Sequence, residues 1–180
     1  MTKIVQVLVD EHKRIRRMLL CFEAELNIFE RAEKSDYEIL EGSIAYCQEY
    51  LDQWHHPRED VLLDLLQRRS PEDARDCESL EDQHLRLARS TKELVKVFEA
   101  VERDAMFPRA AIVEMGRTLI GNYRSHLDWE ECRFFPVVTA HLSFEDWQDI
   151  AKRFADAADP LADNPVDRRY RALFRAIDDA

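Results

Sequence analysis

The chain has few of the residues that β folds and membrane proteins require. Only 3 glycines and 6 prolines occur in 180 residues, which leaves little room for the many tight turns of a β-rich fold. No apolar run approaches the length of a membrane span. Leu, Ala, Glu, Arg and Asp are abundant instead, and this composition favours helices. We therefore expect an all-α protein that does not cross a membrane.

Positive charge is also scarce. The chain has 26 lysines and arginines and 37 aspartates and glutamates, so its formal net charge is −11. A chain this acidic is repelled by nucleic-acid phosphates and by anionic lipid surfaces. We expect neither nucleic acid nor a membrane among its partners.

The 4 cysteines show no CxxC pairing, and each falls inside an expected helix. They are Cys21, Cys47, Cys77 and Cys132. The first nine residues are a short apolar-rich run without the cleavage site of a signal peptide. We expect buried, reduced thiols in a cytoplasmic protein.

Apolar residues recur every three or four positions in four long stretches, which is the pattern of amphipathic helices. Loop-like sequence separates them at 32–36, 69–72 and 104–108. Ser70 and Pro71 should start the third helix, and Pro136 should end the fourth soon after it. Pro57 should bend the second helix. We predict an up-down-up-down antiparallel four-helix bundle.

The remainder of the chain should add one or two helices. Ser143 can cap the first, with Asp146 three residues on, and Asn164 and Pro165 should begin the last. We expect residues 1–180 to form one domain, with the bundle in about 1–140 and a helical extension in about 141–180.

Four histidines fall at positions that such a bundle would bring to one level: His12, His55, His84 and His126. The midpoints between successive histidines fall near residues 34, 69–70 and 105, all within the three expected loops. Helices rise about 1.5 Å per residue, so equal residue counts on either side of a turn give equal heights. A core histidine taken singly is usually structural, but this shared register favours a metal site.

Two of these histidines carry a glutamate one helical turn later. His55 is followed by Glu59 and His126 by Glu130, so each pair points to the same side of its helix. Buried carboxylates without partners are costly, and two cations at this level would compensate both. Imidazole and carboxylate donors without a thiolate suit iron or manganese, and zinc can also use them. The expected metal ligands are His12, His55, Glu59, His84, His126 and Glu130.

The ordered pattern resembles the hemerythrin-like, or HHE cation-binding, family in its bacterial form with four histidines and two glutamates. The matching stretches lie within about residues 5–145 and are 10–12, 54–60, 81–84 and 126–136. The resemblance implies two non-haem iron ions with an oxo- or hydroxo-type bridge. It implies that Glu59 and Glu130 bridge them. His12 and His55 would serve one iron, and His84 and His126 the other.

The chain differs at two positions from the oxygen-carrying hemerythrins. Those proteins have a second histidine one turn after the third-helix ligand, where this chain has Ala88. They use an aspartate five residues after the last histidine, where this chain has Glu131. The resemblance thus implies a binder, sensor or buffer of oxygen, nitric oxide or iron. It equally fits a redox enzyme acting on peroxide or nitric oxide, or repairing iron centres. A zinc-bound or empty bundle for protein interaction is a third reading.

Several nearby residues have two readings from sequence. His56 lies one residue off the ligand face and is either near the site or, the favoured reading, partly solvated. Glu81 is a solvated group first and a ligand second. Glu131 is expected to face outward, although it could replace Glu130. Tyr123 is either a core residue with its hydroxyl satisfied or a hydrogen-bond donor to a bound diatomic molecule.

Overall fold

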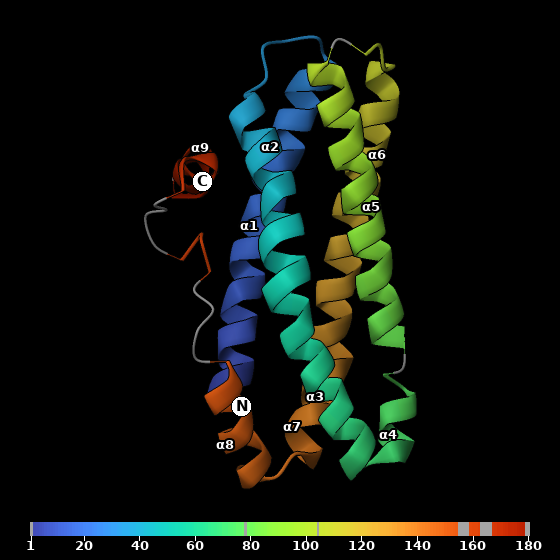
Figure 1. Ribbon diagram of the computed structural model, residues 1–180, viewed down its shortest axis with the longest axis vertical. Coiled ribbons are helices and arrows are strands. Elements are labelled where there is room, and N and C mark those ends of the chain that lie inside the picture. Colours follow the sequence, from blue (N-terminus) through green and yellow to red (C-terminus); the bar gives the residue numbers. More distant parts are fainter. Residues whose placement is uncertain (1, 78, 104, 155–158, 163–166, 179–180) are drawn as a thin grey trace.

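The computed structural model describes residues 2–77, 79–103, 105–154, 159–162 and 167–178, and it has the predicted all-α architecture. Four long helical arms run antiparallel to one another (Figure 1). The first arm is α1 (Lys3–Glu30), and the second joins α2 (Tyr37–Tyr46), η1 (Cys47–His55) and α3 (His56–Arg69). The third arm is α5 (Ser79–Glu102). The fourth joins α6 (Arg109–Trp129), η2 (Glu130–Phe134) and α7 (Phe135–His141).

The first and third expected loops separate the arms as the sequence predicts. Thr2 caps α1, and the carboxylate of Asp36 accepts from the Glu38 amide at 2.9 Å to cap α2. Between them the chain turns through Ala32, whose φ of 61° lies in the left-handed region. Residues 103–108, as far as they are described, link α5 to α6.

The second turn differs from the expectation that one helix starts at Ser70 and Pro71. Pro71 does open a helix there, but α4 (Pro71–Arg75) ends after five residues and α5 starts afresh at Ser79. Cys77 therefore lies in a turn and not inside a helix, although its side chain is buried. Cys21 and Cys47 are buried as expected, whereas Cys132 is exposed because it lies on the outer side of η2.

Two π-helical segments change the expected effect of the prolines. η1 directly precedes α3, which has Pro57 in its first turn, and η2 directly precedes α7, which has Pro136 in its first turn. A proline lacks an N–H and crowds the carbonyl four residues earlier, and the wider π turn accommodates both effects. Pro136 therefore does not end the fourth arm, which continues to His141.

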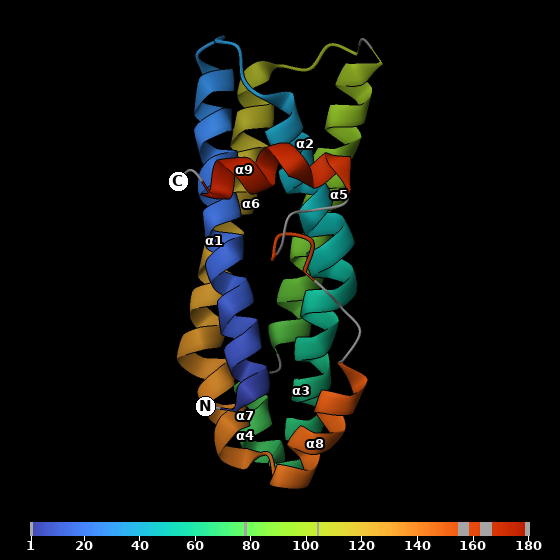
Figure 2. The same cartoon turned by 90° about the vertical axis from the view of Figure 1, so that its left-hand side faces the viewer.

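The C-terminal part adds two short helices against the bundle, as predicted. α8 (Phe144–Arg153) begins with a capping box formed by Ser143 and Asp146, and Arg69 on α3 bonds to Asp146 at 2.8 and 3.0 Å. A 3-10 turn, η3 (Arg168–Tyr170), leads into α9 (Arg171–Asp178), which lies across α1 and α2 (Figure 2). The predicted start at Asn164 and Pro165 lies outside the described residues.

The hydrophobic core is divided by a polar layer. One buried cluster is built around Phe22, Leu26 and Tyr123, and a second around Leu8, Leu62 and Phe134. The four histidines in register lie between the two clusters along every arm. No helix in the described part of the chain is long and apolar enough to span a membrane.

A pair of glycine substitutions tests how the C-terminal helix is seated. A Cβ on Gly42 of α2 would lie 2.8 Å from the backbone carbonyl oxygen of Arg169, whereas a Cβ on Gly121 of α6 meets nothing within 4 Å. Gly42→Ala should therefore destabilise the protein by about 1–3 kcal/mol, the usual cost of overpacking. Gly121→Ala should stabilise it by about 0.5–1 kcal/mol because alanine favours helix. Chemical denaturation measures the free energy of unfolding of both variants. Equal effects of the two substitutions would contradict the close packing of the C-terminal segment against Gly42.

Candidate metal centre

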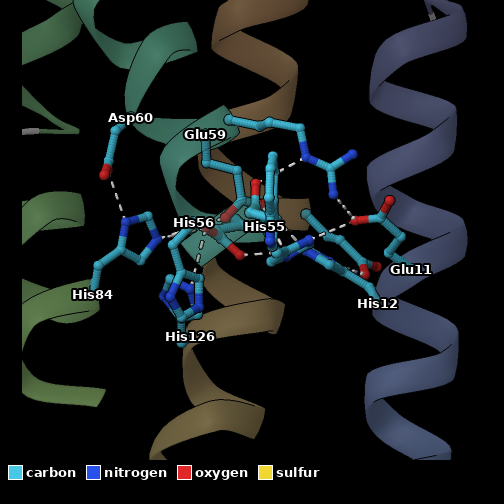
Figure 3. A network of polar contacts seen from close by, with 12 residues as sticks. Glu11, His12, His55, His56, Glu59, Asp60, His84 and His126 are labelled. Carbon is cyan, nitrogen blue, oxygen red and sulfur yellow. Dashed lines mark hydrogen bonds and ion pairs between the residues drawn. The ribbon is translucent and has the colours of Figure 1, made fainter. Parts of the chain in front are cut away.

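The four arms bring all six expected ligands together in one buried layer. His12 comes from α1, His55 ends η1, Glu59 lies on α3, and His84 lies on α5 (Figure 3). The fourth arm contributes His126 near the end of α6 and Glu130 at the start of η2. None of the six side chains has more than 7% of its surface exposed. The shared height that the sequence predicts is therefore present.

The two glutamates each present one oxygen to each side of the layer. Oε1 of Glu59 lies 3.4 Å from Nε2 of both His12 and His55, and its Oε2 lies 3.6 Å from Nε2 of His84. Oε2 of Glu130 lies 3.5 Å from Nε2 of His12. Its Oε1 lies 3.5 and 3.2 Å from Nε2 of His84 and His126. Each carboxylate thus spans two sets of histidines.

These distances suit donors that share an ion better than they suit hydrogen bonds. Charge-assisted N–H···O bonds measure about 2.7–2.9 Å. Donors bound to one cation at about 2.1 Å each lie roughly 3 Å apart. Several of the inward-facing atoms have no hydrogen-bond partner in the part of the structure that is described: Nε2 of His55, His84 and His126, Oε2 of Glu59, and both oxygens of Glu130.

A second ring of acceptors surrounds the histidines and closes on itself. In each case Nδ1–H donates to an acceptor on another arm, which leaves Nε2 facing inward. His55 donates to Glu11 at 2.7 Å and His84 to Asp60 at 2.8 Å (Figure 3). His126 donates to the amide oxygen of Gln83 at 3.2 Å, and His12 to Glu131 at 2.9 Å. Every arm thus orients a histidine on another arm.

Sequence reasoning missed Glu11, Asp60 and Gln83, although the signal was present. Each is the chain neighbour of an expected ligand: Glu11 precedes His12, Asp60 follows Glu59, and Gln83 precedes His84. Neighbouring helix positions are rotated by about 100°, so such a residue faces the next arm when its neighbour faces the core. An acceptor beside each ligand is therefore the pattern to look for.

Glu131 and His56 lie closer to the site than expected. Glu131 does not simply face outward, because it accepts from His12 and from Arg16 at 2.6 Å. The hydrogen bond from His12, more than that from Arg16, lowers the pKa of Glu131 to about 2. His56 is only 3% exposed, which corrects the expectation of partial solvation, and its ring stacks on that of His84 with centroids 4.3 Å apart.

Glu81 and Tyr123 are also placed by the structure. Glu81 is exposed, in agreement with its reading as a solvated group. Tyr123 is fully buried, but its hydroxyl has no hydrogen-bond partner among the described residues, so it is a core residue without the expected satisfied hydroxyl.

The carboxylates of the layer exceed its cations. Apart from Asp52, whose pKa burial raises to about 7, five carboxylates and two guanidinium groups lie in or directly around it, which leaves an excess of three negative charges while the histidines are neutral. They are Glu11, Glu59, Asp60, Glu130 and Glu131, with Arg16 and Arg58. Partial protonation of the histidines can offset this excess, and so can bound cations.

The histidine pKa values reflect this imbalance. Burial would lower the pKa of His12, but its bonds to Glu131 and Glu59 outweigh burial and raise it to about 9. The pKa of His84 rises to about 10, because its hydrogen bond to Asp60 and the nearby carboxylate of Glu130 outweigh burial. Burial and the charge of His84 lower the pKa of His126 to about 3. Burial and then His84 also hold the pKa of His56 well below its ordinary value.

Among the described residues, an apolar groove and a more polar groove approach the layer from different sides. An apolar groove of about 510 Å³ is lined by Val5, Val9, Glu131, Phe135, Pro136, Thr139 and Ala140. It reaches the site at Phe135, whose ring stacks on His12 with centroids 5.4 Å apart. A more polar groove of about 350 Å³ lies on α5 and α6 and is lined by Gln83, Arg86, Leu87, Asn122, Ser125, His126 and Trp129.

The stability of the metal-free protein should peak near pH 6.5. Histidines titrate at about 6.5 in an unfolded chain. Protonated His12 and His84 stabilise the folded state. Their contributions to the free energy of unfolding are complete below that pH and are lost as pH rises through about 9 and 10. The contribution of neutral His126 is complete above it and is lost as pH falls towards 3. Melting temperatures of chelator-treated protein across this range provide the test, and a monotonic curve would contradict these pKa directions.

The comparison with known proteins agrees with this geometry. No curated protein and no solved structure matches the chain significantly. A family model, the hemerythrin HHE cation binding domain, matches residues 3–138, which include all four arms up to α7 and the whole polar layer. The chain therefore belongs to the hemerythrin HHE cation-binding domain family.

Proposed function

We propose that this protein holds two metal ions, chiefly iron, in its bundle core and there binds or senses a small ligand such as oxygen or nitric oxide. The observation that carries the proposal is the placement of Glu59 and Glu130. Each directs one oxygen to the side of His12 and one to the side of His84. A carboxylate in that position can bridge two ions. His12 and His55 would hold one ion, and His84 and His126 the other.

The four histidines and two glutamates suit a pair of iron ions. Neutral imidazoles and carboxylates suit iron and manganese, and six protein donors are more than one tetrahedral zinc ion uses. Two irons that share the carboxylates would have coordination positions left for an external ligand, and bound iron would supply the electrons for redox chemistry. The protein residues hold the tautomer of each histidine through Nδ1, and the two apolar clusters exclude bulk water.

The apolar groove supports an uncharged ligand. Its walls are mainly Val5, Val9, Phe135 and Ala140, and it ends against the ring that stacks on His12. An uncharged diatomic molecule loses little hydration on entering such a groove, whereas an ion or a strong hydrogen-bonding molecule loses much more.

The polar groove favours the alternative function, redox catalysis at the same centre with peroxide as substrate. His126 itself lines this groove, next to Arg86 and Asn122, whose side chains can hydrogen-bond a peroxide. Sustained release of oxygen from added peroxide by iron-loaded protein would support the enzyme. Stoichiometric reaction without turnover would support the binding or sensing role.

The metal content tests the proposal most simply. Protein purified from iron-replete cells should contain two metal ions per chain, chiefly iron, by elemental analysis. Glu59→Ala and Glu130→Ala should lose metal almost completely, because each removes donors to both ions. Glu131→Ala should weaken binding by only about 10–100-fold, since it removes an acceptor behind His12.

Glu81→Ala is the matched control for these variants. Glu81 is exposed and should be replaceable without loss of metal. One zinc ion per chain and no iron would contradict the proposal. Metal loss in Glu131→Ala but not in Glu130→Ala would show that the ligand on the fourth arm is misassigned.

The two grooves can be tested separately by filling each with a tryptophan. Ala140→Trp narrows the apolar groove, and Ser125→Trp narrows the polar one. In stopped-flow mixing of ferrous protein, Ala140→Trp should slow the reaction with nitric oxide several-fold and leave that with peroxide nearly unchanged. Ser125→Trp should do the reverse. Metal analysis of both variants controls for site damage, and equal slowing of both reactions by either variant would contradict separate routes.

A further inference from the structure

The site contains a fifth imidazole that the six-ligand set does not use. We propose that His56 is a metal ligand, the third imidazole of the ion held by His84 and His126. This inference rests on the proposed two-metal function and gives the two ions unequal surroundings, with three imidazoles on one and two on the other.

The position of His56 on its helix carries the first part of the argument. His55 ends η1 and His56 begins α3, so the two are consecutive and their side chains diverge by about 100°. The His55 ring lies beside His12, with centroids 5.1 Å apart. The His56 ring lies on the other side, 4.3 Å from His84 and 5.5 Å from His126. Consecutive histidines thus face the two different halves of the centre.

Distances within this group match those of the other candidate donor sets. One ring nitrogen each of His56, His84 and His126 lies within 4.8 Å of the other two, as also holds for the donor atoms of His12, His55 and Glu59. All members of both groups are buried. His56 therefore lies close enough to share an ion with His84 and His126 once its ring turns out of the parallel stack with His84, whose plane it matches within 13°.

His56 also has a carboxylate beside its ring, although no hydrogen bond joins the two, since Oδ1 of Asp52 has no hydrogen-bond partner among the described residues. Nδ1 of His56 faces Oδ1 of Asp52, one turn earlier on the same arm, at 3.4 Å. The other four histidines direct Nδ1 to an acceptor and Nε2 to the interior. An acceptor at Nδ1 fixes the tautomer whose Nε2 lone pair is available to a metal.

Proton NMR of the cobalt-loaded full-length protein tests the proposal. When a histidine binds paramagnetic Co²⁺ through Nε2, its Nδ1–H gives a strongly shifted resonance that disappears in heavy water. The wild-type protein with two equivalents of Co²⁺ should show five such resonances, from His12, His55, His56, His84 and His126. His56→Gln should show four, and it should bind one of its two Co²⁺ ions at least about tenfold more weakly.

Two control variants complete the experiment. His141→Gln removes a more exposed histidine that pairs with Asp73, and it should keep all five resonances. Asp52→Asn should keep five and shift one of them. Four exchangeable resonances in the wild type would overturn the role of His56 and leave the two-metal proposal standing. No shifted resonance at all would overturn both.

Discussion

The burial of two carboxylates, Glu59 and Glu130, is the constraint on which the rest of the structure depends. Neither has exposed surface, and neither meets a lysine or arginine; only histidine Nε2 atoms face them among the described residues. Such groups are stable in an apolar interior only when positive charge is supplied beside them. Raised pKa values at His12 and His84 show how the histidines can supply part of it by holding protons. Two metal ions would supply this positive charge without protons. Because the buried carboxylates are unfavourable without such charge, their burial would favour metal binding.

The outer acceptors join the four arms at the level of the polar layer. Each of the four histidines is held by an acceptor from another arm, so the arms are tied in a closed ring at this level. The ring is not symmetric, since His126 has the neutral amide of Gln83 at 3.2 Å where the others have carboxylates at 2.7–2.9 Å. An imidazole that is hydrogen-bonded to a carboxylate binds a metal ion more strongly than one that is hydrogen-bonded to an amide. Together with the third imidazole proposed for His56, this makes the two halves of the centre chemically different.

The sequence predicts the parts of this arrangement that depend on spacing alone. The equal spacing of four histidines from three turns predicts the common level at which they lie, and the i, i+4 spacing predicts that Glu59 and Glu130 lie beside His55 and His126. Spacing could not predict the π-helical segments η1 and η2, because they arise from the fit of Pro57 and Pro136 within packed helices. It could not predict the break between α4 and α5 either. The burial of His56 was missed because an ideal α-helix places it off the ligand face, whereas here it directly follows a π turn.

Anomalous diffraction from crystals of iron-loaded protein, recorded at the iron absorption edge, tests the central claim most directly. The account predicts two peaks within the polar layer. One should lie between the Nε2 atoms of His12 and His55, the other beside those of His84 and His126, and both within bonding distance of Glu59 and Glu130. A single peak, or peaks that do not share the two carboxylates, would contradict it.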